Sequence, residues 1–228
     1  MPSIHVASSP RPLLRRVILL GTPVALLLAG LAHPLLDHVH TIQMLTPINT
    51  WWIILHVLLI PLFALMGWSF FLLLEGINSR TATVSRYAAI VYTSFAIGYD
   101  AAVGLTSGIL VSNIGALSVS QQTIIQGALD QLFTSPAIIL SYYILLAAGI
   151  VTIVSAALAL SSQGVPRLPL FLLLGTVLSA YSHALPFGPL GSACFFLAAL
   201  WLELAWRPAI TQQASPFLPG FEIELPNQ

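Results

Sequence analysis

Six long apolar runs dominate the pattern of hydrophobic and polar positions along this chain. They cover residues 13–32, 51–75, 87–111, 136–160, 168–184 and 190–206. Each run is within the range of about 17 to 25 residues that an α-helix needs to cross the hydrocarbon core of a bilayer. Apolar residues follow one another without alternation, which argues against barrel strands, and backbone groups in lipid must be paired internally. The pattern therefore predicts an all-α transmembrane helical bundle with six spans.

The stretch between the third and fourth runs, residues 112–135, has a different pattern. Glutamines and one aspartate occupy one side of it, and apolar residues recur on the other at helical spacing: Ile124, Ile125, Ala128, Leu129, Leu132 and Phe133. This predicts an amphipathic helix that lies on the outer membrane surface. Residues 1–206 are then expected to form one transmembrane domain, and the polar, proline-rich residues 207–228 a flexible cytoplasmic tail.

The arginines divide the connecting segments into two sets. Three of them precede the first run or lie in its first turn, and the others fall in alternate loops and after the sixth run: Arg11, Arg15, Arg16, Arg80, Arg86, Arg167 and Arg207. With six spans, every arginine lies on the same side of the membrane. Because short cytoplasmic loops are enriched in arginine and lysine, that side is predicted to be cytoplasmic and to hold both termini. We expect a multi-pass protein of the bacterial cell (inner) membrane.

The first run permits a second interpretation. Arg15 and Arg16 precede an apolar stretch that ends in Gly30-Leu31-Ala32, which is the arrangement of a secretory signal peptide with a small-residue cleavage site. Cleavage there would leave five spans and place the new N-terminus outside. The run is long enough for a complete span, and this favours retention.

Composition agrees with a membrane environment and restricts the function. Hydrophobic residues make up 57% of the 228 residues, charged residues make up 6%, and the mean hydropathy is +0.94, whereas soluble domains carry about 25% charged residues. The net charge of zero argues against nucleic acid as a partner and leaves the lipid bilayer. The chain has no lysine, which excludes a retinal Schiff base, and its single cysteine, Cys194, cannot form an intrachain disulfide.

Asp100 is the first candidate for a functional residue, because a carboxyl group near the middle of a span costs about 2.5–3.5 kcal/mol on insertion scales. Gly104 and Gly108 share its helix face, where small residues let a neighbouring helix approach. His56 of the second span is the expected partner, although its predicted depth is roughly 5–10 Å nearer the outer surface. Together with His183, at the outer end of the fifth run, these residues predict an outward-facing pocket for a small ligand, a proton or a metal ion. In the structural alternative, Asp100 only ties helices together.

A second group of candidate metal ligands lies in the first outer loop. His33, Asp37, His38 and His40 offer imidazole and carboxylate groups that suit zinc, copper or nickel. Their spacing matches no specific metal motif, and a solvated polar loop is the alternative. A cytochrome with two b haems would need paired histidines at two depths, and the sequence supplies only the outer level.

Three classes of function follow from these residues. The first is the binding or transport of a small ligand, proton or metal ion at His56, Asp100 and His183. The second is a membrane-embedded enzyme that depends on a metal ion or on haem, and the third is a structural or accessory subunit that uses none of these groups. Two acidic residues have simpler roles: Glu203 is predicted to pair with Arg207 at i,i+4 spacing, and Glu75 lies near Arg80.

A set of aromatic, charged and turn residues spread over most of the chain supports one resemblance. The set comprises Trp52, His56, Pro61, Arg86, Tyr99 and Asp100 in the stretch 51–100, followed by His183 and by Pro186-Phe187-Gly188-Pro189-Leu190-Gly191. In this general pattern the chain resembles a group of bacterial multi-pass membrane proteins that carry no assigned activity. The likeness implies the multi-pass architecture and no particular function.

Overall fold

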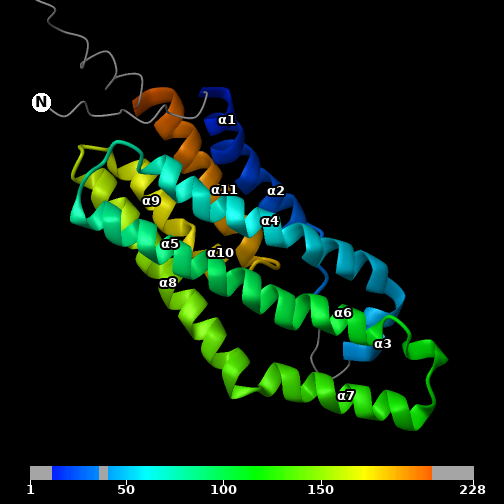
Figure 1. Cartoon of the computed structure of the whole chain (residues 1–228). Coiled ribbons are helices and arrows are strands. Elements are labelled where there is room, and N and C mark those ends of the chain that lie inside the picture. Colours follow the sequence, from blue (N-terminus) through cyan, green and yellow to red (C-terminus); the bar gives the residue numbers. More distant parts are fainter. Residues whose placement is uncertain (1–11, 36–40, 207–228) are drawn as a thin grey trace, which may run out of the picture.

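The computed structural model describes residues 12–35 and 41–206, and every regular element within them is helical (Figure 1). In chain order the elements are α1 (Pro12–Arg16), η1 (Val17–Gly21), α2 (Thr22–Leu31), α3 (Thr41–Leu45), η3 (Thr46–Ile48), α4 (Asn49–Leu73), α5 (Arg80–Tyr99), η4 (Asp100–Leu105), α6 (Thr106–Val111), η5 (Ile114–Ala116), α7 (Val119–Thr134), α8 (Pro136–Ser161), α9 (Arg167–Gly175), α10 (Val177–Tyr181), α11 (Phe187–Trp201) and η6 (Leu202–Trp206). The segments η1, η4 and η6 are π-helical, whereas η3 and η5 are short 3-10 helices. The all-α prediction is confirmed for the described residues.

Five helical stretches in the described part of the chain are long and apolar enough to cross a membrane. They are Leu13–Leu31, Thr41–Leu73, Arg80–Ala116, Pro136–Ser161 and Phe187–Trp206, and they match five of the six predicted spans. The run predicted over 168–184 corresponds to α9 and α10, a shorter apolar stretch of Arg167–Tyr181. The helices are therefore compatible with an integral membrane protein, and the sixth crossing stays a prediction.

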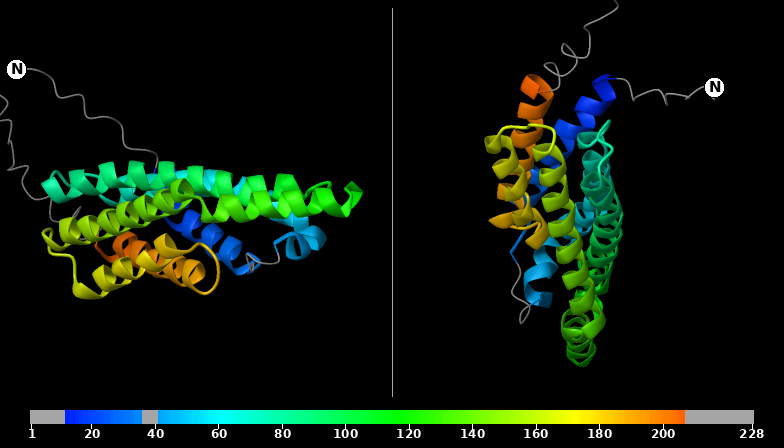
Figure 2. Two further views of the ribbon diagram at one scale, coloured as in Figure 1. Left: turned by 90° about the horizontal axis from the view of Figure 1, so that it is seen from below. Right: turned by 90° about the vertical axis from the view of Figure 1, so that its left-hand side faces the viewer.

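Helices that are distant in sequence lie side by side in the bundle (Figures 1 and 2). α5 packs along α8, and α11 packs against both α2 and α9. In the apolar core, Phe70 of α4 meets Phe195 of α11 with ring centroids 5.2 Å apart. Small residues allow close approach, as where the free thiol of Cys194 lies against Gly175. Such close packing supplies most of the attraction between helices in lipid, where the hydrophobic effect between them is weak.

A second, smaller core lies at the end of the bundle that holds α3, α6 and α7 (Figure 1). Its buried members are Leu45, Trp52, Val111, Ile114 and Leu129. Helix α7 begins with a capping box, in which Ser118 Oγ accepts from the backbone N–H of Gln121 and the Gln121 side chain accepts from the N–H of Ser118. The helix predicted within residues 112–135 is thus present, and its position on the membrane surface stays a prediction.

One buried arginine holds the opposite end of the bundle together. Arg15 of α1 donates from Nη1 to the Leu72 carbonyl oxygen at 2.6 Å and to Glu75 Oε2 at 2.7 Å, and from Nη2 to Glu203 Oε1 at 2.6 Å. These bonds join α1 to the end of α4 and to η6. From sequence spacing, Glu75 was placed near Arg80 and Glu203 was predicted to pair with Arg207, which lies outside the described residues. The structure shows Arg15 as a partner of both acids. Sequence spacing could not predict this contact, because Arg15 is far from both acids along the chain.

Candidate metal centre

Three histidines from separate segments meet near the ends of their helices. His33 follows the C-terminal end of α2, His56 belongs to α4, and His183 lies in the connection between α10 and α11. One ring nitrogen from each lies within 4.8 Å of the other two, and the Nε2 atoms of His33 and His183 are 3.1 Å apart. Nitrogens bound to one tetrahedral zinc ion at 2.0–2.1 Å are separated by roughly 3.3 Å. The pair of His33 and His183 therefore has nearly the spacing that a single metal ion requires, and the His56 nitrogen lies within 4.8 Å of both.

Two of these rings are oriented by bonds to backbone carbonyl groups. Nδ1 of His33 lies 2.8 Å from the Pro34 oxygen, and Nδ1 of His56 lies 2.8 Å from the Trp52 oxygen. A carbonyl oxygen only accepts, so Nδ1 carries the proton in both rings and Nε2 of a neutral ring presents a lone pair. Burial lowers the pKa of His33 below its ordinary value of 6.5, which keeps that ring neutral at pH 7. An imidazole whose other nitrogen donates to a carbonyl is the usual arrangement of a metal-bound histidine.

The carboxyl group of Asp100 lies beside this cluster. Asp100 is the first residue of η4, is 2% exposed, and places Oδ1 3.8 Å from Nε2 of His56. Both of its carboxyl oxygens are buried and have no hydrogen-bond partner among the described residues. A buried carboxylate without a partner is costly. Imidazole nitrogens and carboxyl oxygens thus face one space, in which the contact between His183 and His33 supplies at most one hydrogen, and a cation in that space would satisfy these groups together.

His56 Nε2 lies 3.8 Å from Asp100 Oδ1, although the sequence predicts an offset of roughly 5–10 Å between the two residues along the helix axis. The difference arises because α5 begins at Arg80, earlier than the predicted start at residue 87. Ser79 caps this earlier start by accepting from the backbone N–H of Ala82 at 3.1 Å. The two residues therefore lie at nearly equal distances from the α4–α5 connection, and their side chains meet.

Gly104 makes room for the His56 ring. A Cβ atom at Gly104 would overlap Cδ2 and Nε2 of His56. Trp52 covers the ring from another side, with ring centroids 4.1 Å apart, and its Nε1 donates to the Gly104 carbonyl oxygen at 2.7 Å. Gly108 lies similarly close to Ile53 and Trp52. The predicted small-residue face of this span is confirmed, and it brings α4 close enough for His56 to reach Asp100.

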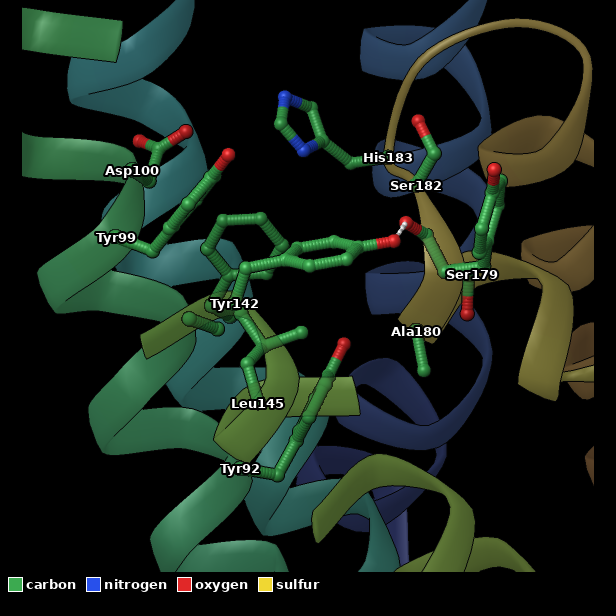
Figure 3. A pocket seen from close by; sticks show the side chains of 12 residues that line it. Tyr92, Tyr99, Asp100, Tyr142, Leu145, Ser179, Ala180, Ser182 and His183 are labelled. Carbon is green, nitrogen blue, oxygen red and sulfur yellow. Dashed lines mark hydrogen bonds between the residues drawn. The ribbon is translucent and has the colours of Figure 1, made fainter. Parts of the chain in front are cut away.

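Two cavities adjoin the cluster and share four lining residues. A cavity of about 270 Å³ contains the three histidines, Asp100, Trp52 and Gly104 in its walls. A second cavity, of about 160 Å³, is lined mainly by aromatic and small residues (Figure 3). The residues common to both are Tyr99, Asp100, Ser182 and His183. In Figure 3 the His183 ring and the Asp100 carboxyl group lie across the top of this second cavity.

The structure brings together all three residues of the predicted pocket, His56, Asp100 and His183. It adds His33, which the sequence grouped with Asp37, His38 and His40, three residues that lie outside the described part of the chain. His33 could have been distinguished from that group by its position, because it directly follows the first apolar run whereas the other three residues lie further into the loop. Tyr99, Tyr142 and Ser182 did not belong to the predicted site, and no motif marks them.

The donor set indicates which cofactors this site can hold. Neutral imidazoles suit zinc, copper, nickel and iron ions, and α2 directs the negative end of its dipole toward His33, which favours a cation. A cavity of about 270 Å³ is smaller than the roughly 300–1,000 Å³ of typical cofactor pockets, so a hydrated ion fits better than a haem. Comparison of the chain with protein-family models, with curated proteins and with solved structures finds no match.

Proposed function

We propose that this chain is a membrane protein that binds one divalent transition-metal ion, of the zinc class, through Nε2 of His33, His56 and His183. The observation that carries the proposal is the convergence of three ring nitrogens beside the carboxyl group of Asp100, whose oxygens have no hydrogen-bond partner among the described residues. The three imidazole rings are neutral and the Asp100 carboxylate is negative, so together with a bound divalent ion they would carry a net charge of +1. Three imidazoles, with the fourth position left to an oxygen donor, form a ligand set that is common in zinc sites.

The arginine distribution supports a position for the site near the outer surface. Arg15 and Glu203 join α1 to η6, whereas the histidine cluster lies beyond the far end of the same N-terminal helical stretch, where His33 follows α2. In the proposed topology, α9 and α10 form a short fifth span, six spans place both termini in the cytoplasm, and the metal centre opens toward the outside of the cell membrane. An ion would then reach the site without crossing the bilayer.

Metal analysis of the purified protein tests this function. After equilibration with zinc and removal of free ion, we expect about one zinc per chain in the wild type. His56→Ala and His183→Ala each remove one of three ligands, so both should retain less than about a tenth of that amount after the same wash. The control is His5→Ala, because His5 is predicted to lie on the cytoplasmic side.

Two results would contradict the proposal. Wild-type protein that retains no zinc, copper, nickel or iron after equilibration with each ion would exclude a metal centre of this kind. Zinc that persists in His56→Ala and His183→Ala but disappears in His38→Ala and His40→Ala would place the ion at the other candidate group, in the first outer loop.

A further inference from the structure

The cavity of about 160 Å³ extends from the proposed metal centre into the bundle. Asp100 and His183 form its upper wall in Figure 3, whereas Tyr92 and Ala180 lie at its lower end. The Tyr142 hydroxyl donates to the Tyr181 carbonyl oxygen at 3.0 Å and so fixes one aromatic side of the wall. Because Asp100 and His183 also line the histidine cavity, an ion bound there would be accessible from this chamber.

The space narrows sharply beyond Tyr92 and Ala180. The next cavity has a volume of about 10 Å³ and is bounded by Phe70, Ile153 and Thr176, which leaves room for about one water molecule. Oγ1 of Thr176 is buried there without a hydrogen-bond partner among the described residues, so a single water would satisfy it. The 160 Å³ chamber therefore ends near Tyr92 and Ala180, beyond which only a water-sized space continues.

The walls of the chamber indicate which molecules it can accept. Its members are Phe63, Ala96, Leu145, four tyrosines and two serines, besides Asp100, His183 and Ala180. No arginine is among them, so the wall offers an anion no counter-charge apart from the metal ion, beside which the Asp100 carboxylate stands, and a cation would be repelled by the metal ion. Aromatic rings and hydroxyl groups favour an uncharged molecule with an apolar body and one polar atom. The volume corresponds to about five water molecules.

We infer that the metal centre is open: three histidines hold the ion, and the fourth coordination position faces the tyrosine-lined chamber. The chamber takes a small uncharged substrate, whose carbonyl or hydroxyl oxygen reaches the ion beside Asp100. This inference rests on the proposed metal-binding function. Zinc enzymes keep such an exchangeable position, whereas structural zinc sites are closed by four protein ligands. Of the three classes of function considered from the sequence, an open metal centre of this kind fits the membrane-embedded metalloenzyme.

Cobalt-loaded protein tests the inference, because the visible spectrum of Co²⁺ reports its coordination. The probe is imidazole at pH 8, a small ring that is mostly uncharged at that pH. We expect imidazole to shift the cobalt spectrum of the wild type. Ala96→Leu, which fills the chamber without touching the histidines, should weaken imidazole binding about tenfold or more. Ser94→Leu is the control, because Ser94 lies on the exposed side of the same helix.

A second pair of variants avoids the risk that a filled chamber prevents folding. Tyr142→Ala enlarges the chamber and should bind 4-phenylimidazole, a larger ring system, about tenfold or more tightly than the wild type. Tyr143→Ala removes the neighbouring tyrosine, which is 60% exposed, and should leave this binding unchanged. Equal binding of 4-phenylimidazole by the wild type, Tyr142→Ala and Tyr143→Ala would overturn the assignment of the chamber.

The outcomes separate this inference from the proposed function. Bound cobalt whose spectrum does not respond to imidazole would show a closed site, with Asp100 as the fourth ligand, and would overturn the inference while the metal-binding function stands. Cobalt that does not bind at all would contradict the proposed function itself. An Ala96→Leu protein that binds cobalt and responds to imidazole like the wild type would place the open position away from the chamber.

Discussion

Replacement of Gly104 by alanine is expected to reduce zinc affinity about 100-fold or more. The added methyl group would occupy the position of the His56 ring, and the ring has little freedom to move. The Trp52 ring packs against it at a centroid distance of 4.1 Å and a tilt of 38°, and Nδ1 of His56 donates to the Trp52 carbonyl oxygen at 2.8 Å. His56 must therefore leave the cluster or α4 must separate from η4, and either change removes one metal ligand. Competition with a calibrated zinc chelator measures the loss.

Gly98→Ala is the matched control for this prediction. Gly98 lies in α5, and a Cβ atom there would meet no other atom within 4 Å. Alanine is the better helix former by about 1 kcal/mol, so this variant should bind zinc like the wild type and be no less stable. Wild-type zinc affinity in Gly104→Ala would mean that His56 is not a ligand, and the metal would then have to be held by other groups.

Replacement of Arg15 by methionine should lower the free energy of unfolding by about 3–5 kcal/mol, the cost of breaking a buried ion pair by removing one partner. The change eliminates three hydrogen bonds of 2.6–2.7 Å to Leu72, Glu75 and Glu203, while a methionine of similar length keeps the packing. Glu203 is 6% exposed, so its carboxylate cannot recover the lost interaction from water. Unfolding by SDS in mixed micelles, followed by circular dichroism, measures the difference.

Arg16→Met provides the comparison, because Arg16 is the next residue and is exposed. Its replacement should change stability by about 0.5 kcal/mol or less. The double variant Arg15→Met/Glu203→Gln should be more stable than Arg15→Met alone, since the amide removes a buried negative charge that Arg15 no longer balances. Equal stability of Arg15→Met and Arg16→Met would show that the network contributes little to the fold.

Run length and hydrophobicity predicted five helices that are long and apolar enough to cross a membrane, because a lipid-exposed helix needs apolar residues over its whole length. The main error concerned the start of α5. Charged and polar residues from Arg80 to Arg86 indicated a loop, but the helix continues through them. Arg86 remains in the helix because its Nη2 donates to the Leu74 and Ile77 carbonyl oxygens at 2.7 and 3.1 Å, which are acceptors at the end of α4.

The candidate site was only partly predictable. His56, Asp100 and His183 were identified because polar groups within apolar runs are costly and therefore informative. His33 was grouped with Asp37, His38 and His40, its neighbours along the chain. Sequence spacing does not show that α2 ends beside the connection between α10 and α11. That proximity depends on tertiary packing, in which Gly30 lies so close to the His183 carbonyl oxygen that an added Cβ would be 2.6 Å from it.

The position of His183 also bears on when the proposed metal centre would form during biosynthesis. His33 and His56 belong to the first helices to be synthesised, but the third proposed ligand follows only after α10 has emerged from the ribosome. Nascent chains that end before this point would carry two of the three imidazoles and would hold an ion weakly. Tight metal binding would therefore be acquired late in synthesis, and a chelator-resistant ion would distinguish complete molecules from stalled intermediates.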